Sequence, residues 1–260
     1  MKKMSRWVKV ILSTFLAVVL LFVLFFGRTL YGLAQSNPLA TSALTENVYV
    51  VQTGTANFYL IRGNSGYIAV DAGSSKEQAS HELNTLGISP DDVFAVFLTH
   101  SDIDHIAAIS LYPNATLYLS ELELPLIEGT AQRASGRLLF IFSLFSVLNL
   151  NDDNPIFPHD FTIINHNEKM EIDGLLIQSF LTPGHMSGSM CFLVDDKYLF
   201  TGDTMSIING RAGRFFHLFD MDNDQAKESI SKIATVPAQY IFTSHHGYSD
   251  NLDFVFENWD

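Results

Sequence analysis

Four segments of this chain place histidine or aspartate directly after a short apolar run. They are FLTHSDIDH (97–105), LTPGH (181–185), LFTGD (199–203) and FTSHHG (242–247). A strand end is held rigidly while the loop after it is accessible, so a site built there is both ordered and reachable. We therefore expect a fold that brings these four strand ends to one place.

The chemistry of these side chains indicates bound metal. Imidazole nitrogen and carboxylate oxygen are the ligands of hydrolytic zinc, and they also suit iron and manganese. The single cysteine, Cys191, excludes a multi-cysteine zinc site and an internal disulfide. Two divalent ions roughly 3.5–4 Å apart can activate a water between them. The sequence therefore predicts a centre with two divalent metal ions, expected to be zinc, with iron or manganese as alternatives.

The same segments carry a resemblance to a known family. THSDIDH (99–105) resembles the His-x-His-x-Asp-His motif of the metallo-β-lactamase superfamily, and TPGH, TGD and HHG resemble its later landmarks in the same order. The likeness runs from Asn47 to Gly247, and it is nearest to glyoxalase II-like and lactonase-like members. It implies an α/β fold, a four-layer αββα sandwich, with the site at one edge.

The resemblance also implies a ligand for each position of the centre. One metal would be held by His100, Asp102 and His185, and the other by Asp104, His105 and His246, with Asp203 bridging the two. His246 is favoured over His245 because it directly precedes Gly247, as in the Gly-His-Gly of the family. Asp104 is also the expected catalytic residue, which would orient the attacking hydroxide or accept its proton.

Asp102 is a departure, because the family usually has histidine at this position. With Asp102, each metal would have two histidines and one aspartate besides the bridge, a set that suits iron(II) as well as zinc. The alternative is a degenerate site that binds little metal. Asp71, at the end of the segment GYIAVDAG (66–73), resembles a common family feature and is expected to orient a ligand histidine.

The N-terminus has a different composition. Val10 to Phe26 is apolar except for Ser13 and Thr14, and it follows four basic residues, Lys2, Lys3, Arg6 and Lys9. A membrane-spanning helix needs about 17–25 apolar residues, whereas the apolar core of a signal peptide has about 7–15. The positive-inside rule puts the rest of the chain on the extracytoplasmic side of the cell membrane. Residues 1–27 are thus expected to be a single-pass anchor; the alternative is a signal cleaved after Ala34, which would give a secreted protein.

The rest of the chain is expected to form a linker and one domain. Residues 28–46 are the expected linker, and residues 47–260 are the expected metallo-β-lactamase-like domain. Within it, NVYVVQ, ANFYLIRG and GYIAVDAG predict an antiparallel meander, followed by a helix from Ser75 to Leu86. Residues 130–162, rich in phenylalanine and leucine, are expected to be an insertion that forms a packed helix, a lid over the site or a surface that touches the membrane. As a border of the pocket, it would favour an apolar acyl group.

The expected function is metal-dependent hydrolysis of an ester, thioester, lactone or amide in a small-molecule substrate, by a metal-bound hydroxide. Removing the five basic residues of the first 34 from the net charge of −13 leaves about −18 on the remainder, which argues against nucleic-acid binding. Three alternatives stay open: hydrolysis of phosphodiesters or sulfate esters, a di-iron redox protein, and a non-catalytic binding module.

Overall fold

The computed structural model describes residues 5–131, 157–158, 160–214 and 219–259. The chain divides into two compact units, residues 1–35 and residues 36–260, and each is described by itself. Most of the expected insertion at 130–162, namely residues 132–156 and 159, lies outside the described residues.

The first unit is a single long helix, α1 (Arg6–Gln35). Its first part, Arg6–Leu24, has a mean hydropathy of 2.5 over 19 residues, and by length and composition alone it could cross a membrane. Large apolar side chains such as Phe15 and Leu21 are exposed on it. The helix continues through Gln35, so residues 28–35, expected as linker, belong to its last turns.

The second unit contains two mixed sheets. The seven-stranded sheet has the order β1-β2-β3-β4-β5-β6-β7. Strands β2, β3 and β4 form the expected antiparallel meander, whereas β4 to β7 are parallel. The strands of this sheet are β1 (Ser42–Ala43), β2 (Val48–Thr53), β3 (Ala56–Arg62), β4 (Tyr67–Val70), β5 (Val93–Phe97), β6 (Thr116–Leu119) and β7 (Thr162–Ile163).

The six-stranded sheet has the order β15-β14-β11-β10-β9-β8, and only the pair β11 and β14 is parallel. A separate two-stranded hairpin follows β11 in the chain. The strands are β8 (Lys169–Ile172), β9 (Leu175–Leu181), β10 (Met190–Val194), β11 (Tyr198–Phe200), β12 (Ser206–Ile208), β13 (Arg211–Gly213), β14 (Tyr240–Phe242) and β15 (Tyr248–Ser249).

Two helices of eleven residues cover the outer faces, and the first of them begins and ends where the sequence predicts. In α2 (Lys76–Leu86), the Ser75 hydroxyl accepts from the backbone N–H of Gln78, and Gly87 closes the helix in a left-handed conformation. In α6 (Asn223–Ile233), the Asp222 carboxylate caps the first turn. The shorter elements are η1 (Pro90–Asp92), α3 (Ile103–Ile106), η2 (Ile109–Leu111), η3 (Glu121–Glu123), α4 (Leu124–Ile127) and α7 (Leu252–Phe256).

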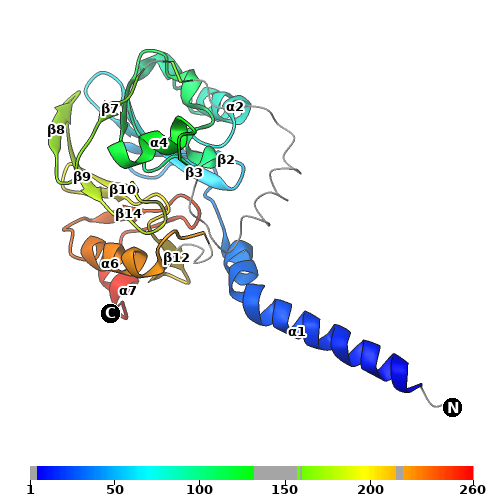
Figure 1. The fold of residues 1–260 in the computed structure, drawn as a ribbon. Helices are drawn as coiled ribbons and strands as arrows, with labels where there is room; N and C mark the ends of the chain where they lie inside the picture. Colours follow the sequence, from blue (N-terminus) through cyan, green and yellow to red (C-terminus); the bar gives the residue numbers. More distant parts are fainter. Residues whose placement is uncertain (1–4, 132–156, 159, 215–218, 260) are drawn as a thin grey trace. The chain divides into compact units, whose positions relative to one another are not determined.

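The layers are held together by three apolar clusters. The first lies between α2 and the seven-stranded sheet and includes Leu83. The second lies between the sheets, where the rings of Phe97 and Phe192 are 5.2 Å apart, and each ring stabilises the fold by roughly 1.5–3 kcal/mol. The third joins Leu199 of the other sheet to Ile230 of α6. With α2 on one side and α6 and α7 on the opposite side, the arrangement is the expected αββα sandwich (Figure 1).

Residues 36–46, expected as part of the linker, pair with the rest of the second unit. Strand β1 pairs with β2, and the buried side chain of Asn57 exchanges two hydrogen bonds of 2.8 Å with the backbone of Leu39. The backbone N–H of Asn37 donates to the carbonyl of His245 at 3.0 Å. This segment lacks a long apolar run, so nothing local in its sequence revealed that it pairs with the sheet.

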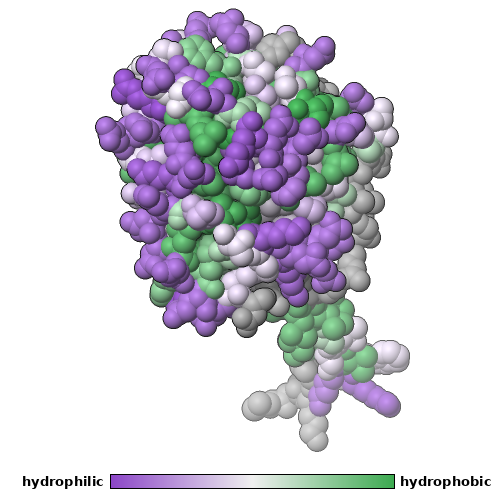
Figure 2. All heavy atoms as spheres, turned by 90° about the vertical axis from the view of Figure 1, so that its left-hand side faces the viewer, coloured by the Kyte–Doolittle hydropathy of each residue, from purple (hydrophilic) through white to green (hydrophobic). Residues whose placement is uncertain are grey.

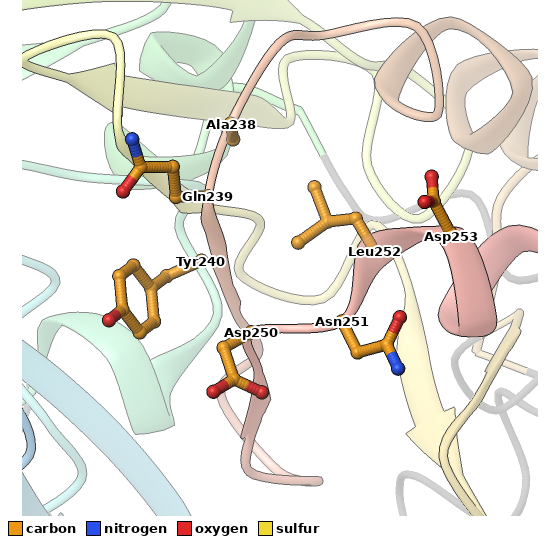
Figure 3. A pocket seen from close by; sticks show the side chains of 7 residues that line it. All are labelled: Ala238, Gln239, Tyr240, Asp250, Asn251, Leu252 and Asp253. Atoms are coloured by element: carbon orange, nitrogen blue, oxygen red, sulfur yellow. The ribbon is translucent and has the colours of Figure 1, made fainter.

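The face of the second unit seen in Figure 2 carries hydrophilic side chains with hydrophobic areas between them. One pocket of about 450 Å³ lies at the beginning of β14 and beside α7, and Tyr240, Asp250 and Leu252 are among its lining residues (Figure 3). None of the residues that line it belongs to the four segments with histidine and aspartate. It is therefore distinct from the site described next.

Candidate metal centre

The structure brings the four strand ends together. His100 follows β5, His185 follows β9, Asp203 follows β11, and His245 follows β14. Their ligand atoms, with those of three neighbouring residues, form overlapping groups in which all atoms lie within 4.8 Å of one another. The members of these groups are His100, Asp102, Asp104, His105, His185, Asp203 and His245.

Three of these residues form what we call the His185 position. Asp102 Oδ2 lies 3.2 Å from His185 Nε2 and 3.6 Å from His100 Nε2. Both histidines are buried, whereas the Asp102 side chain is 21% exposed. This position is therefore open to solvent on its carboxylate side.

Three others form the His245 position. Asp104 Oδ2 lies 3.4 Å from His245 Nε2, and Asp104 Oδ1 lies 3.8 Å from His105 Nε2. The Asp104 side chain is 30% exposed, while His105 is fully buried. The two positions thus repeat one design, with two buried histidines and one aspartate that reaches solvent.

Asp203 lies between the two positions. Its Oδ2 is 3.6 Å from His185 Nε2 and 3.5 Å from His105 Nε2, and its Oδ1 is 3.3 Å from His245 Nε2. The carboxylate is only 4% exposed. One oxygen of this carboxylate therefore borders both positions, as expected of a bridging residue.

His245, and not the expected His246, contributes to the cluster. The hydroxyl of Thr243 accepts from the backbone N–H of His246, and Gly247 has a φ of 77°. This tight loop turns the His245 ring inward, where its Nδ1 lies 2.7 Å from the carbonyl oxygen of Thr55. His246 is buried but belongs to none of the ligand groups found among the described residues. The adjacent glycine suggested His246, but the direction of the loop selects its neighbour.

Asp71 has the orienting role that the sequence suggested. Its Oδ2 lies 2.8 Å from Nδ1 of His105, and both of its oxygens accept from the hydroxyl of Thr99. That hydroxyl in turn lies 3.0 Å from Nδ1 of His100. One buried carboxylate thus fixes two imidazole rings with their Nε2 atoms directed inward.

Two further partners were missed by the sequence analysis. Asp220 Oδ1 lies 3.5 Å from Nδ1 of His185, and both side chains are 1% exposed. The carbonyl of Thr55 holds His245. Every residue has a backbone carbonyl, so the residue type at position 55 does not indicate that it binds a histidine. Asp220 stands in the segment LFDMDND, where the sequence does not distinguish it from the other aspartates.

Close packing of carboxylates and imidazoles shifts their pKa values in opposite directions. Burial lowers the pKa of His105, but Asp203, Asp71 and Asp104 together raise it well above the usual value. Burial raises the pKa of Asp203, but His245 and His105 hold it well below the usual value. Asp203 is therefore an anion over the whole physiological range, as a metal-bridging carboxylate must be.

Burial and neighbouring carboxylates also shift the pKa of His185 in opposite directions, whereas the pKa of the single cysteine is shifted mainly by burial. Burial lowers the pKa of His185, but hydrogen bonds with Asp102 and Asp220 raise it to about 9. Burial raises the pKa of Cys191 to about 11, so this thiol is unreactive at neutral pH. The raised histidine pKa values show that the carboxylates of the cluster favour bound cations, which are either protons or metal ions.

The donor set fits metal ions. Two atoms each about 2.1 Å from one tetrahedral metal lie about 3.4 Å apart. The carboxylate-to-imidazole distances, from 3.2 to 3.9 Å, scatter around that value. Within the described residues, the buried atoms His100 Nε2, His105 Nε2 and Asp203 Oδ1 have no hydrogen-bond partner. Such atoms are costly to bury unless something binds them.

Comparison with known proteins agrees with this geometry. The family model of the metallo-beta-lactamase superfamily matches residues 51–245, which include all seven residues of the cluster. The chain belongs to the metallo-β-lactamase superfamily. Membership accounts for the order of the four ligand segments along the chain and for the αββα sandwich.

Two relatives within the superfamily are named as hydrolases. A probable polyketide biosynthesis zinc-dependent hydrolase of Bacillus velezensis is 27% identical over 147 residues, which are 55% of this chain and 52% of that protein. The hydroxyacylglutathione hydrolase of Klebsiella pneumoniae is 27% identical over 166 residues, 62% of this chain and 51% of that protein. The chain thus spans about half the length of these relatives.

Solved structures of the superfamily show the same fold. A family member from Thermus thermophilus superposes with a TM-score of 0.61 at 20% identity, covering 81% of this chain and 77% of that one. An archaeal member from Sulfolobus tokodaii gives 0.61 at 20% identity, covering 83% and 85%. At this identity the likeness concerns the fold alone.

Proposed function

We propose that this protein is a hydrolase that uses two divalent metal ions to cleave an ester, thioester, lactone or amide in a small molecule. The observation that carries the proposal is the convergence of four imidazole Nε2 atoms and three carboxylates on a partly open site. Zinc is the expected metal, and the zinc-dependent relative supports it. Iron and manganese suit the same donors.

Each residue of the cluster has a distinct part in this proposal. His100, Asp102 and His185 would hold one ion, and Asp104, His105 and His245 the other, with Asp203 shared. When bound, the two ions supply Lewis acidity and lower the pKa of a water molecule. The chain itself orients the rings, because the Nδ1 atoms of all four histidines lie near fixed polar groups.

Asp104 is the proposed catalytic residue. Its side chain is 30% exposed, whereas that of Asp203 is 4% exposed, so Asp104 can contact both the cluster and an entering substrate. One oxygen would remain with the His245 position while the other accepts the proton of the attacking water. A carboxylate within hydrogen-bond reach of that proton is suited to general-base catalysis.

We also propose that α1 anchors the protein in the cell membrane, with the second unit on the extracytoplasmic side. The run from Arg6 to Leu24 is long and apolar enough to span, and basic residues precede it. A cleaved signal would leave a secreted enzyme instead. Mass analysis of the mature N-terminus in membrane and culture-medium fractions separates the two.

Metal analysis of the full-length protein, purified in detergent without added metal, tests the function. We expect about two zinc, iron or manganese ions per chain, and loss of metal and of ester or thioester hydrolysis in Asp203→Ala. Asp220→Asn serves as a graded control, because it only weakens the support of one ring. A wild-type protein that stays metal-free after incubation with all three metals would contradict the proposal and favour a binding module.

A further inference from the structure

A buried glutamate outside the cluster ties together two of its loops. Glu123 ends the short turn η3 and is fully buried. Its Oε2 accepts from the backbone N–H of Ser101 at 3.0 Å and from the Ser101 hydroxyl at 2.5 Å. Its Oε1 accepts from the backbone N–H of Gly188 at 2.8 Å. All three partners are donors, so both oxygens act as acceptors.

The two residues that Glu123 binds belong to the two loops of the His185 position. Ser101 stands between His100 and Asp102, and Gly188 lies three residues after His185. These loops come from different sheets, since the first follows β5 and the second follows β9. Glu123 therefore links the loop that carries His100 and Asp102 to the loop that carries His185.

Local packing shows that this link is tightly fitted. A Cβ atom at Gly188 would lie 2.6 Å from Glu123 Oε1, closer than real contacts allow. A larger residue at Gly188 would therefore displace the Glu123 side chain from its present place. Asp71 serves both positions, because it holds His105 directly and His100 through Thr99, whereas Glu123 bonds the two loops at Ser101 and Gly188.

We propose that Glu123 is a positioning residue for one metal only. It holds the loop of His100 and Asp102 against the loop of His185, and so sets the separation of the three ligand atoms of the His185 position. This role rests on the proposed two-metal function. It predicts an asymmetry: weakening Glu123 loosens the His185 position and leaves the His245 position intact.

Glu123→Gln tests the proposal in the full-length protein in detergent. A glutamine offers one acceptor oxygen where three donors converge on two, so one loop loses its bond. Zinc affinity, measured by competition with a chromogenic chelator, should fall about 10–100-fold for one ion and stay unchanged for the other. Glu121→Gln, an exposed residue of the same turn, is the matched control and should leave both affinities unchanged.

Ligand variants identify which ion is affected. In a protein that carries Asp102→Ala, adding Glu123→Gln should cause no further loss of zinc, because the His185 position is already disrupted. In a protein that carries His245→Ala, adding it should lower the affinity for the remaining ion by the same factor as in the wild-type background. Such non-additivity is the signature of residues that act on one site. A general structural role for Glu123 would weaken the remaining ion in both backgrounds.

Ser101→Ala covers the case in which Glu123→Gln does not fold. It removes only the hydroxyl bond to Glu123 and should lower the same affinity by a smaller factor. Equal affinity losses for both ions, or none in either variant, would overturn the positioning role while leaving the two-metal function intact. A wild-type protein without zinc would instead overturn the function, and with it this role of Glu123.

Discussion

Asp71 Oδ2 lies 2.8 Å from Nδ1 of His105, and Asp71 itself has a φ of 64°. The left-handed backbone turns the carboxylate back over the end of β5, where it also accepts from the backbone N–H of Thr99. The left-handed conformation of Asp71, at the end of β4, therefore helps to orient His105 in the loop after β5.

Asp71→Asn should lower metal affinity by about 10–100-fold with little loss of fold stability. Asparagine tolerates the left-handed conformation, but its single acceptor cannot serve both His105 and Thr99. Competition titration with a chelator measures the affinity. Asp196→Asn is the matched control, because Asp196 has a φ of 49° and is exposed. Equal affinities in both variants would contradict the orienting role.

Asn57→Ala should destabilise the second unit by about 1–3 kcal/mol, because it leaves the backbone N–H and C=O of Leu39 without their partner. It should also weaken the His245 position, since the same segment donates from Asn37 to the His245 carbonyl. Urea unfolding and zinc titration measure the two effects. Asn114→Ala, at an exposed site, should stay within about 0.5 kcal/mol of wild type.

The metal-free protein should lose stability as the pH rises from about 6.5 to 9. The folded pKa of His185 is raised to about 9, and those of His105 and His245 are raised too, above the unfolded value of about 6.5. Their contribution is complete below the unfolded pKa and disappears as the pH passes the folded pKa. Bound zinc replaces these protons, so zinc should raise Tm more at pH 9 than at pH 6.5. A zinc-induced shift in Tm that is independent of pH would argue against this linkage.

Asp102→His should move the pH–rate profile to lower pH and improve hydrolysis of anionic esters relative to neutral ones. Two divalent ions, three aspartates and one hydroxide sum to zero charge, and a histidine in place of Asp102 leaves +1. The lost carboxylate would make the bound water more acidic. Rates for a neutral and a carboxylated ester over a pH series test this. Unchanged profiles would show that Asp102 does not set the charge of the site.

The family, the sandwich and six of the seven residues in the cluster could be predicted from the amino-acid sequence alone. Strand ends followed by ligand-type residues can be read locally, because a strand, its turn and the first residues after it are contiguous. The helix expected from Ser75 to Leu86 is local for the same reason. So is the orienting role of Asp71, which stands at a strand end.

Features that depend on contacts between distant segments became visible only in the folded protein. His245 replaces His246 because Thr243, Gly247 and the carbonyl of Thr55 together set the direction of one loop. Glu123 reaches Gly188 across 65 positions, a distance at which residue type carries no information about contact. Hydrogen bonds between loops form only after the two sheets have packed, so no local pattern in the sequence could specify them.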